Sequence, residues 1–161
     1  MYRIGYGEDT HRLTANRKLI LGGVEIPFEL GLLGHSDADV LTHSIIDALL
    51  GACALGDIGN SFPDSDDAYK GISSIALLMR TTELIKSYGF TPINVDVSLI
   101  AQKPKLASYR DEMRCQLAEA MSINIEQVSV KFTTPEHLGA EGRLEGMSAR
   151  AVALVSSITK P

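Results

Sequence analysis

The chain is poor in cysteine and lacks any long apolar run. Among its 161 residues only Cys53 and Cys115 are cysteines, and they form no C-x-x-C pair. We expect both on helices rather than in a disulfide framework, which fits a reducing compartment. No stretch is apolar for long enough to cross a bilayer, and the N-terminus lacks a basic segment followed by an apolar one. The sequence therefore predicts a soluble protein without a secretion signal.

Positive charge is also scarce, because 15 Lys and Arg stand against 20 Asp and Glu, for a formal net charge of -5. This balance argues against nonspecific binding to nucleic acid, which depends on a concentrated basic surface. It is compatible with a small phosphorylated ligand, because such a ligand needs only local cations. Candidates for these cations are Lys103, Lys105, Lys131 and Arg143.

Neither internal repeats nor low-complexity tracts interrupt the chain, and 45% of its residues are hydrophobic. A chain of this length can bury one core, so residues 1–161 are expected to form a single domain. Periodicity and turn residues predict strands at 2–9, 93–100, 127–132 and 147–158, a small N-terminal hairpin with arms at 18–21 and 24–27, and helices at 38–53, 72–89 and 106–121. This order indicates an α+β fold, with helices on one face of a mixed sheet and the other face available for self-association.

Asp9 and His11 lie two residues apart at the end of the first predicted strand, and His43 lies in the first predicted helix. Side chains separated by two residues on a strand share a face, so Asp9 and His11 can bind one ion together. One oxygen and two nitrogens suit zinc, and three protein ligands leave a coordination position free, as in catalytic zinc sites. A lone D-x-H pattern is weak, since histidines more often pack or face solvent. The place of the pair at a strand end favours a functional site.

The residues before the first predicted helix are turn formers, with Ser36 or Asp37 expected as its N-cap. Asp39, His43 and Asp47 follow at four-residue steps and therefore share one stripe of the helix. Either of the two flanking carboxylates can orient His43, a common accompaniment of metal-bound imidazole. The alternative is a stripe in which all three side chains simply face water.

Two further segments have the composition of functional loops. Residues 56–67 are rich in turn formers and too long for a plain connection. The run Thr-Thr-Pro-Glu at 133–136 has the N-cap, first-turn proline and acidic residue of a helix start. The free N–H groups of such a start and the threonine hydroxyls can bind phosphate, and Glu136 can bind a hard cation such as magnesium. From these four residues alone, an ordinary capped turn is the simpler interpretation.

Seven motifs occur together, in order and with compatible spacing. They are Asp9-Thr10-His11, the run from His35-Ser36-Asp37 to His43, Ala48-Leu49-Leu50-Gly51-Ala52, Gly56-Asp57-Ile58-Gly59, Phe62-Pro63-Asp64, Pro104-Lys105 and Thr133-Thr134. This combination spans nearly the whole chain and resembles the 2-C-methyl-D-erythritol 2,4-cyclodiphosphate synthase family. It is far more specific than any one of its motifs.

The resemblance implies a phosphorus-oxygen lyase of the non-mevalonate (methylerythritol phosphate) route to isoprenoid precursors. The implied reaction converts 4-diphosphocytidyl-2-C-methyl-D-erythritol 2-phosphate into 2-C-methyl-D-erythritol 2,4-cyclodiphosphate and releases CMP. The 2-phosphate of the substrate attacks the β-phosphorus, so no serine or cysteine nucleophile is expected. The implied assembly is a homotrimer with its sheets facing the three-fold axis, its active sites between subunits, and an axial cavity proposed to hold an isoprenoid. The implied location is the bacterial cytoplasm, or the plastid stroma after removal of a transit peptide.

The resemblance also assigns roles to residues. It implies zinc at Asp9, His11 and His43, and a second divalent ion, Mg2+ or Mn2+, at Glu136. The residues that match positions aligning or polarising the phosphates in the transition state are His35 and Thr134. Substrate contacts are implied for Asp9, Thr10, His11, His35, Ser36, Asp57, Ile58, Gly59, Phe62, Pro63, Asp64, Ser65, Asp66, Ala101, Gln102, Lys103, Pro104, Lys105, Leu106, Ala107, Thr133, Thr134, Pro135, Glu136 and Arg143, and more loosely for Asp47 and Ala140.

The chain departs from the family pattern at 140–146, where relatives often carry an aromatic residue and a Gly-Arg-Gly-Glu-Gly run. Here the run is Ala-Glu-Gly-Arg-Leu-Glu-Gly. The resemblance therefore does not establish a side-chain contact at Ala140. It also leaves open whether Arg143 approaches the diphosphate or pairs with Glu145 at the trimer axis.

Two other functions stay open on the sequence alone. One is a zinc hydrolase that activates water at the free coordination position, with Asp57 or Glu136 as general base. The other is a noncatalytic trimeric binding module in which the ion only stabilises the fold. Incorporation of solvent oxygen distinguishes the first from a cyclase, and a lack of turnover by well-folded, metal-loaded protein would indicate the second.

Overall fold

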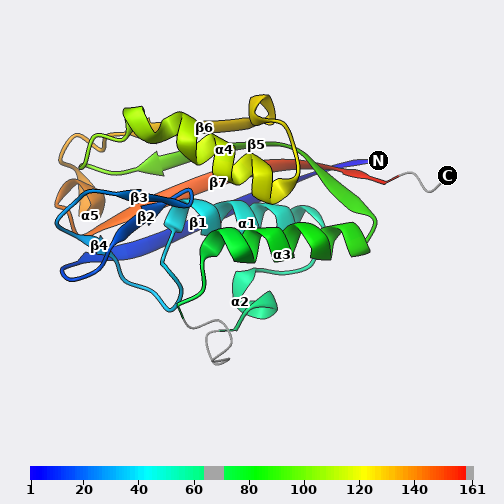
Figure 1. Ribbon diagram of the computed structural model, residues 1–161, viewed down its shortest axis with the longest axis horizontal. Helices are drawn as coiled ribbons and strands as arrows, with labels where there is room; N and C mark the ends of the chain where they lie inside the picture. The colour runs from blue at the N-terminus through cyan, green and yellow to red at the C-terminus, as the bar shows by residue number, and fades with distance from the viewer. Residues whose placement is uncertain (64–70, 159–161) are drawn as a thin grey trace.

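The computed structural model describes residues 1–63 and 71–158 (Figure 1). Its central feature is a five-stranded sheet with the strand order β4-β1-β7-β5-β6. The strands are β1 (Tyr2–Thr14), β4 (Gly31–Leu32), β5 (Phe90–Ile100), β6 (Val128–Thr133) and β7 (Gly146–Ser157). The sheet is mixed, because β5 and β6 pair in parallel and the other neighbours pair antiparallel. A separate antiparallel ladder joins β2 (Leu19–Leu21) to β3 (Val24–Ile26).

The helices are α1 (Val40–Ala52), α2 (Ile58–Ser61), α3 (Ser74–Ser87), α4 (Arg110–Met121) and α5 (Gly139–Gly142), with 3-10 turns at Ala107–Tyr109 and Ile125–Gln127. Figure 1 shows α1 and α4 lying across one side of the sheet, with α3 beside α1. The predicted α+β class, a mixed sheet with helices, is thus confirmed. No helix in the described part of the chain is both long enough and apolar enough to span a membrane.

The inner face of β1 is unusually bare of side chains where α1 crosses it. A Cβ atom added to Gly5 would lie 1.9 Å from the carbonyl oxygen of Ala48, and one added to Gly7 would lie 2.1 Å from that of Ser44. Only glycine allows the helix backbone to approach the strand this closely. Small residues on β7 continue the pattern, because Ala151 and Ala153 are the register partners of these glycines and are fully buried.

The outer face of β1 is apolar and uncovered in the single chain. Tyr2, Ile4 and Tyr6 alternate with the inner glycines and are each more than half exposed, and Val152 on β7 is also exposed. Large apolar side chains on an open sheet face are characteristic of surfaces that meet a partner. This open apolar face corresponds to the sheet face that the sequence analysis expected to be available for self-association.

The start of α1 differs from the prediction, because its N-cap is Asp39 and not Ser36 or Asp37. The Asp39 side chain accepts hydrogen bonds from the backbone N–H of Thr42 (3.0 Å) and from the Thr42 hydroxyl (2.6 Å). It also accepts from the N–H groups of Gly22 (2.9 Å) and Gly23 (2.8 Å) in the β2–β3 turn. The fully buried carboxylate thus ties the turn to the beginning of the helix.

Two strands also differ from the sequence prediction. β1 continues to Thr14, beyond the predicted end at residue 9, because its pairing with β7 runs on through Arg12. Asp9 and His11 therefore lie within the strand and not at its end. The short strand β4 was not predicted, since two residues carry no periodicity.

The two cysteines are free thiols, with Cys115 in α4 and Cys53 at the C-cap of α1.

Replacing Gly7 by alanine should destabilise the fold, because the new methyl group would overlap the α1 backbone. We expect a loss of about 1–3 kcal/mol of unfolding free energy in urea at fixed protein concentration. The matched control is Gly51→Ala in the same helix, where the nearest atom to the new Cβ is 3.7 Å away. This control should gain about 0.5–1 kcal/mol through helix propensity. Equal stability of Gly7→Ala and wild type would contradict the close approach.

Candidate metal centre and active site

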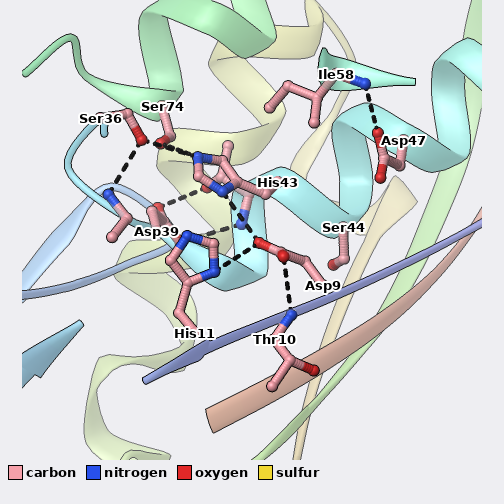
Figure 2. Close-up of polar contacts among 12 residues, drawn as sticks. Asp9, Thr10, His11, Ser36, Asp39, His43, Ser44, Asp47, Ile58 and Ser74 are labelled. Atoms are coloured by element: carbon pink, nitrogen blue, oxygen red, sulfur yellow. Dashed lines mark hydrogen bonds and ion pairs between the residues drawn. The ribbon is translucent and has the colours of Figure 1, made fainter. Parts of the chain in front are cut away.

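Asp9, His11 and His43 converge on one point between β1 and α1 (Figure 2). Asp9 Oδ2 lies 3.0 Å from His11 Nδ1 and 3.0 Å from His43 Nδ1. One ligand atom from each residue lies within 4.8 Å of the other two. Asp9 and His11 come from the inner face of the strand, in line with the two glycines, and His43 comes from the first turn of the helix. The predicted grouping of these three side chains is therefore present.

The three side chains fit a divalent metal ion. His11 Nδ1 is buried and makes no hydrogen bond with the residues of 1–63 and 71–158, although the Asp9 carboxylate is close to it. A buried polar atom without a partner is costly, and an ion between the three donor atoms would satisfy it. Two imidazole nitrogens and one carboxylate oxygen form a donor set typical of zinc and related divalent ions, with a position left for a further ligand.

The opposite edge of the His43 ring is held by two serines. Its Nε2 atom lies 2.8 Å from the Ser74 hydroxyl and 3.1 Å from the Ser36 hydroxyl. Ser74 is fully buried at the start of α3, and its hydroxyl donates to the Asp37 carboxylate, which also accepts from the Ser74 backbone N–H at 2.9 Å. These contacts fix the ring so that Nδ1 faces Asp9.

The carboxylates predicted to orient His43 do not do so. Asp39 is the N-cap described above, and Asp47 accepts a hydrogen bond from the Ile58 backbone N–H at 2.8 Å. The prediction was wrong because four-residue spacing places side chains on one stripe without deciding which neighbouring segments they meet. Asp47 instead links α1 to the short helix α2, whose own N-cap is Asp57.

The charges within the triad favour a bound cation. Burial alone would raise the pKa of the Asp9 carboxyl, but the imidazoles of His11 and His43 hold that pKa well below its usual range. Burial likewise lowers the pKa of His43, but the adjacent Asp9 carboxylate outweighs this and leaves it above its usual value. A proton on His43 competes with a metal ion, so metal affinity should fall as the pH falls through this raised pKa.

A cavity of about 210 Å³ opens beside the triad. Its described lining contains many of the predicted site residues together with three that the sequence did not indicate. The predicted residues are Asp9, His11, His35, Ser36, His43, Ile58, Gly59 and Phe62, and the unexpected ones are Gly34, Ile72 and Leu77, with Ser74 behind the His43 ring. Within the described residues, His35 Nε2 is buried without a hydrogen-bond partner. The cavity therefore offers a free imidazole nitrogen next to a candidate metal site.

A second group of predicted residues gathers away from this lining. The Ala101 backbone N–H donates to the Thr133 carbonyl at 3.1 Å, and the Gln102 side chain accepts from the His137 N–H at 2.9 Å. These bonds hold segment 101–107 against segment 133–137. None of the residues in the two segments belongs to the described lining of the cavity. One chain thus presents two separate parts of the predicted site.

The remaining predicted residues lie in different parts of the chain. Thr10 donates its backbone N–H to Asp9 Oδ1 at 2.8 Å. Arg143 pairs with Glu145 at 2.7 Å and Ala140 is exposed in α5, so neither meets the cavity. Pro63 is exposed. Asp64, Ser65 and Asp66 lie outside the described residues.

The helix start considered at 133–136 does not form, in agreement with the simpler interpretation of this segment as a turn. Glu136 and His137 adopt positive φ angles of 54° and 63°, which a right-handed helix does not allow. The short helix in this region is α5, whose N-cap is Leu138. Thr133 ends β6, and the segment after it is a loop. Among the described residues Glu136 is not part of any group of metal-ligating side chains.

A mixed α+β fold that holds three metal-binding side chains beside a small cavity defines the class as a metal-dependent enzyme of small-molecule substrates. Comparison with known proteins makes the identification more specific. The YgbB family model matches residues 2–156, and the chain belongs to this family.

Curated relatives are more than half identical to this chain over the aligned residues. A protein of Lachnospira eligens named 2-C-methyl-D-erythritol 2,4-cyclodiphosphate synthase is 55% identical over 157 residues, which cover 98% of this chain and 86% of the relative. A protein of the same name from Clostridium beijerinckii is 55% identical over 156 residues, covering 97% and 99%. These matches confirm the family that the sequence motifs indicated.

Solved structures share the fold. The bifunctional IspDF from Campylobacter jejuni matches with a TM-score of 0.94 and 39% identity, covering 98% of this chain and 43% of that longer protein. A 2C-methyl-D-erythritol-2,4-cyclodiphosphate synthase in its CDP-bound form matches with a TM-score of 0.88 and 38% identity, covering 96% and 100%. The CDP complex of IspF from Plasmodium falciparum matches at 0.85 and 34%, covering 98% and 97%.

Replacing His43 by alanine should abolish tight metal binding, since it removes one of three ligands. Metal content measured by mass spectrometry after dialysis should fall from about one divalent ion per chain toward zero, because two ligands bind far more weakly than three. The control is His137→Ala, which removes an exposed histidine outside the triad and should leave the metal content unchanged. Full metal retention by the His43 variant would refute the ligand assignment.

Replacing Ser74 by alanine should weaken metal binding while leaving all three ligands in place. Loss of a group that orients a metal-bound histidine typically costs about 10–100-fold in metal affinity, which competition with a chelator can measure. Ser73→Ala is a close control, because Ser73 is the exposed neighbour and its side chain makes no capping bond. The same affinity for both variants would show that Ser74 does not orient His43.

Proposed function

We propose that this chain catalyses the conversion of 4-diphosphocytidyl-2-C-methyl-D-erythritol 2-phosphate to 2-C-methyl-D-erythritol 2,4-cyclodiphosphate with release of CMP. It would thereby act in the non-mevalonate route to isoprenoid precursors, and we place it in the cytoplasm. The observation that carries the proposal is the metal-binding triad beside a cavity, in a chain 55% identical to synthases of this name over nearly its whole length. Solved relatives with CDP bound support a cytidine diphosphate-linked ligand.

The reaction requires positioning and charge neutralisation more than a protein nucleophile. The 2-phosphate of the substrate attacks the β-phosphorus of its own diphosphate, and CMP leaves with the pair of electrons from the broken P–O bond. Both phosphates are negatively charged, so they must be held together against their repulsion. His35 fits this task, because its Nε2 atom is buried at the cavity, has no partner in the part of the chain that the structure describes, and can donate a hydrogen bond to a phosphate oxygen.

We assign the metal position to Asp9 Oδ2, His11 Nδ1 and His43 Nδ1, and we propose zinc as the ion, on the basis of its preference for this donor set. A bound ion of this kind supplies Lewis acidity and a template for phosphate oxygens. The chain itself holds the His43 ring through Ser74 and orients the carboxylate between the two imidazoles.

We propose a homotrimer in which each active site combines parts of two adjacent chains. The first support is the exposed apolar face of β1 and β7, including Tyr2, Ile4 and Val152, which a neighbouring sheet would cover. The second is the separation within one chain between the cavity and the segments 101–107 and 133–137. A second chain can bring its copy of these segments to the cavity. The sheets would then face the three-fold axis, with an isoprenoid as the ligand we propose for an axial cavity.

In the completed site, the backbone of Ala101–Ala107 would read the cytosine ring, since loop N–H and carbonyl groups match its donor and acceptor atoms. Thr134 would donate to a phosphate in the transition state. Glu136 would hold a second divalent ion, Mg2+ or Mn2+, jointly with the diphosphate.

The test of the function is an assay of CMP release and cyclic diphosphate formation by chelator-treated protein, with zinc and magnesium restored separately and together. We expect equimolar products only when metal is present. Running the assay in 18O-labelled water distinguishes a cyclase from a hydrolase, because cyclisation incorporates no solvent oxygen. Failure of folded, metal-loaded protein to release CMP would contradict the proposal and favour a binding module.

Replacing Thr134 by alanine should lower turnover much more than nucleotide affinity, because its proposed hydrogen bond acts in the transition state. We expect kcat to fall by about 100-fold, in the range typical for removal of one such donor, with KM changed little. CDP binding measured by calorimetry should stay within about threefold of wild type on the same reasoning. Weak CDP binding with normal turnover would assign Thr134 to ground-state recognition instead.

A further inference from the structure

Arg17 is an arginine of the β1–β2 connection that binds the backbone of another loop. Its Nε donates to the Leu32 carbonyl at 3.2 Å, and one terminal nitrogen donates to the carbonyls of Gly34 (3.3 Å) and Ser36 (3.1 Å). The three acceptors belong to alternate residues of one segment, 32–36, whose backbone bends from Gly34 onward. This segment leads from β4 toward α1 and contains His35 between two of the acceptors.

Other backbone contacts hold the same segment from different directions. The Leu33 N–H donates to the Arg12 carbonyl at 2.9 Å, and the His35 carbonyl accepts from the Gly71 N–H at 3.0 Å. Arg17 therefore binds the carbonyls of the residues before and after His35, while the carbonyl of His35 itself is directed to Gly71. These bonds fix the backbone on both sides of His35, and with it the direction in which the His35 side chain leaves the backbone.

The place of Arg17 is itself fixed by close packing. A Cβ atom added to Gly31 would lie 2.3 Å from the Lys18 carbonyl oxygen and 2.4 Å from that of Arg17. Strand β4 thus lies directly against the backbone that carries the guanidinium. On the other side, a Cβ added to Gly34 would lie 2.9 Å from His11 Nε2. Any shift of segment 32–36 would therefore reach both His35 and the ring of a metal-binding histidine.

We propose that Arg17 is a positioning residue of the active site, which fixes segment 32–36 so that His35 and Ser36 face the cavity. A planar guanidinium presents several N–H groups in a fixed fork, and here it bonds to three acceptors at once. A lysine ammonium cannot reproduce this fork, although it retains the charge. The consequence for catalysis rests on the function proposed above, whereas the fixing of the loop does not.

The experiment compares Arg17→Ala and Arg17→Lys with Lys18→Ala, a control that removes an exposed cation from the adjacent residue. Lys18 pairs with Glu25 of β3 at 2.8 Å. Hydrogen exchange measured by mass spectrometry reports the backbone of 33–38 without reference to activity. Steady-state kinetics reports kcat and KM, and metal analysis reports the triad.

We expect backbone hydrogen exchange at 33–38 to be faster than wild type in both Arg17 variants. In Lys18→Ala the exchange rate at 33–38 should equal that of wild type. In the same variants kcat should fall by about 10–100-fold, with KM and metal content changed far less, because a small misplacement of a catalytic group is costly. Added guanidinium ion should partly restore kcat to Arg17→Ala and not to Lys18→Ala. Such rescue would not follow from a general loss of stability.

Two outcomes would overturn the inference. The first is wild-type exchange at 33–38 in both Arg17 variants. The second is a kcat for Arg17→Lys equal to that of wild type, and this test remains decisive if the alanine variant does not fold. If wild-type protein releases no CMP but Arg17→Lys still exchanges faster at 33–38, the proposed function fails while the fixing of the loop by Arg17 is supported.

Discussion

The close approach of α1 to β1 is the constraint on which the rest of the structure depends. Gly5 and Gly7 leave no side chain between the strand and the helix, so the helix backbone lies directly against the sheet. Asp9 and His11 continue the same inner face of the strand, and the first turn of the helix brings His43 to 3.0 Å from Asp9. A larger residue at either glycine would move the helix outward and separate the metal-binding side chains. The two glycines of β1 thus determine both how α1 packs on the sheet and how close the metal-binding side chains lie.

The surroundings of the triad divide into a side that receives ligands and a side that gives support. On the first side lie the cavity and the free Nε2 of His35. On the second side Ser74, backed by Asp37, holds the far edge of the His43 ring. The hydroxyl of Ser74 and the carboxylate of Asp37 are hydrogen-bonded on the supporting side, whereas His11 Nδ1 and His35 Nε2 at the cavity have no hydrogen-bond partner among the described residues. This difference is what an enzyme needs in order to bind an ion and a charged ligand without moving its own scaffold.

Local patterns in the sequence predicted the positions of the helices and strands better than the contacts between them. Period-two alternation located β1, and D-x-H spacing located two metal-binding side chains on one of its faces. Alternation could not decide that the glycines, and not Tyr2 and Ile4, face the helices. Ser74 was missed because it lies 31 residues from His43 and only the packing of α3 brings them together. The Thr-Thr-Pro-Glu run forms a turn, the simpler of the two interpretations, and the positive φ angles of Glu136 and His137 exclude the helix start that was its alternative.

The central claim is that one divalent ion joins the strand to the helix through Asp9, His11 and His43. X-ray absorption spectroscopy on purified, zinc-loaded protein tests it most directly. The account predicts about one zinc per chain, with two imidazole nitrogens and carboxylate oxygen in its first coordination shell at about 2.0–2.2 Å, and no sulfur. A sulfur ligand from Cys53 or Cys115, or a zinc surrounded only by water, would contradict it.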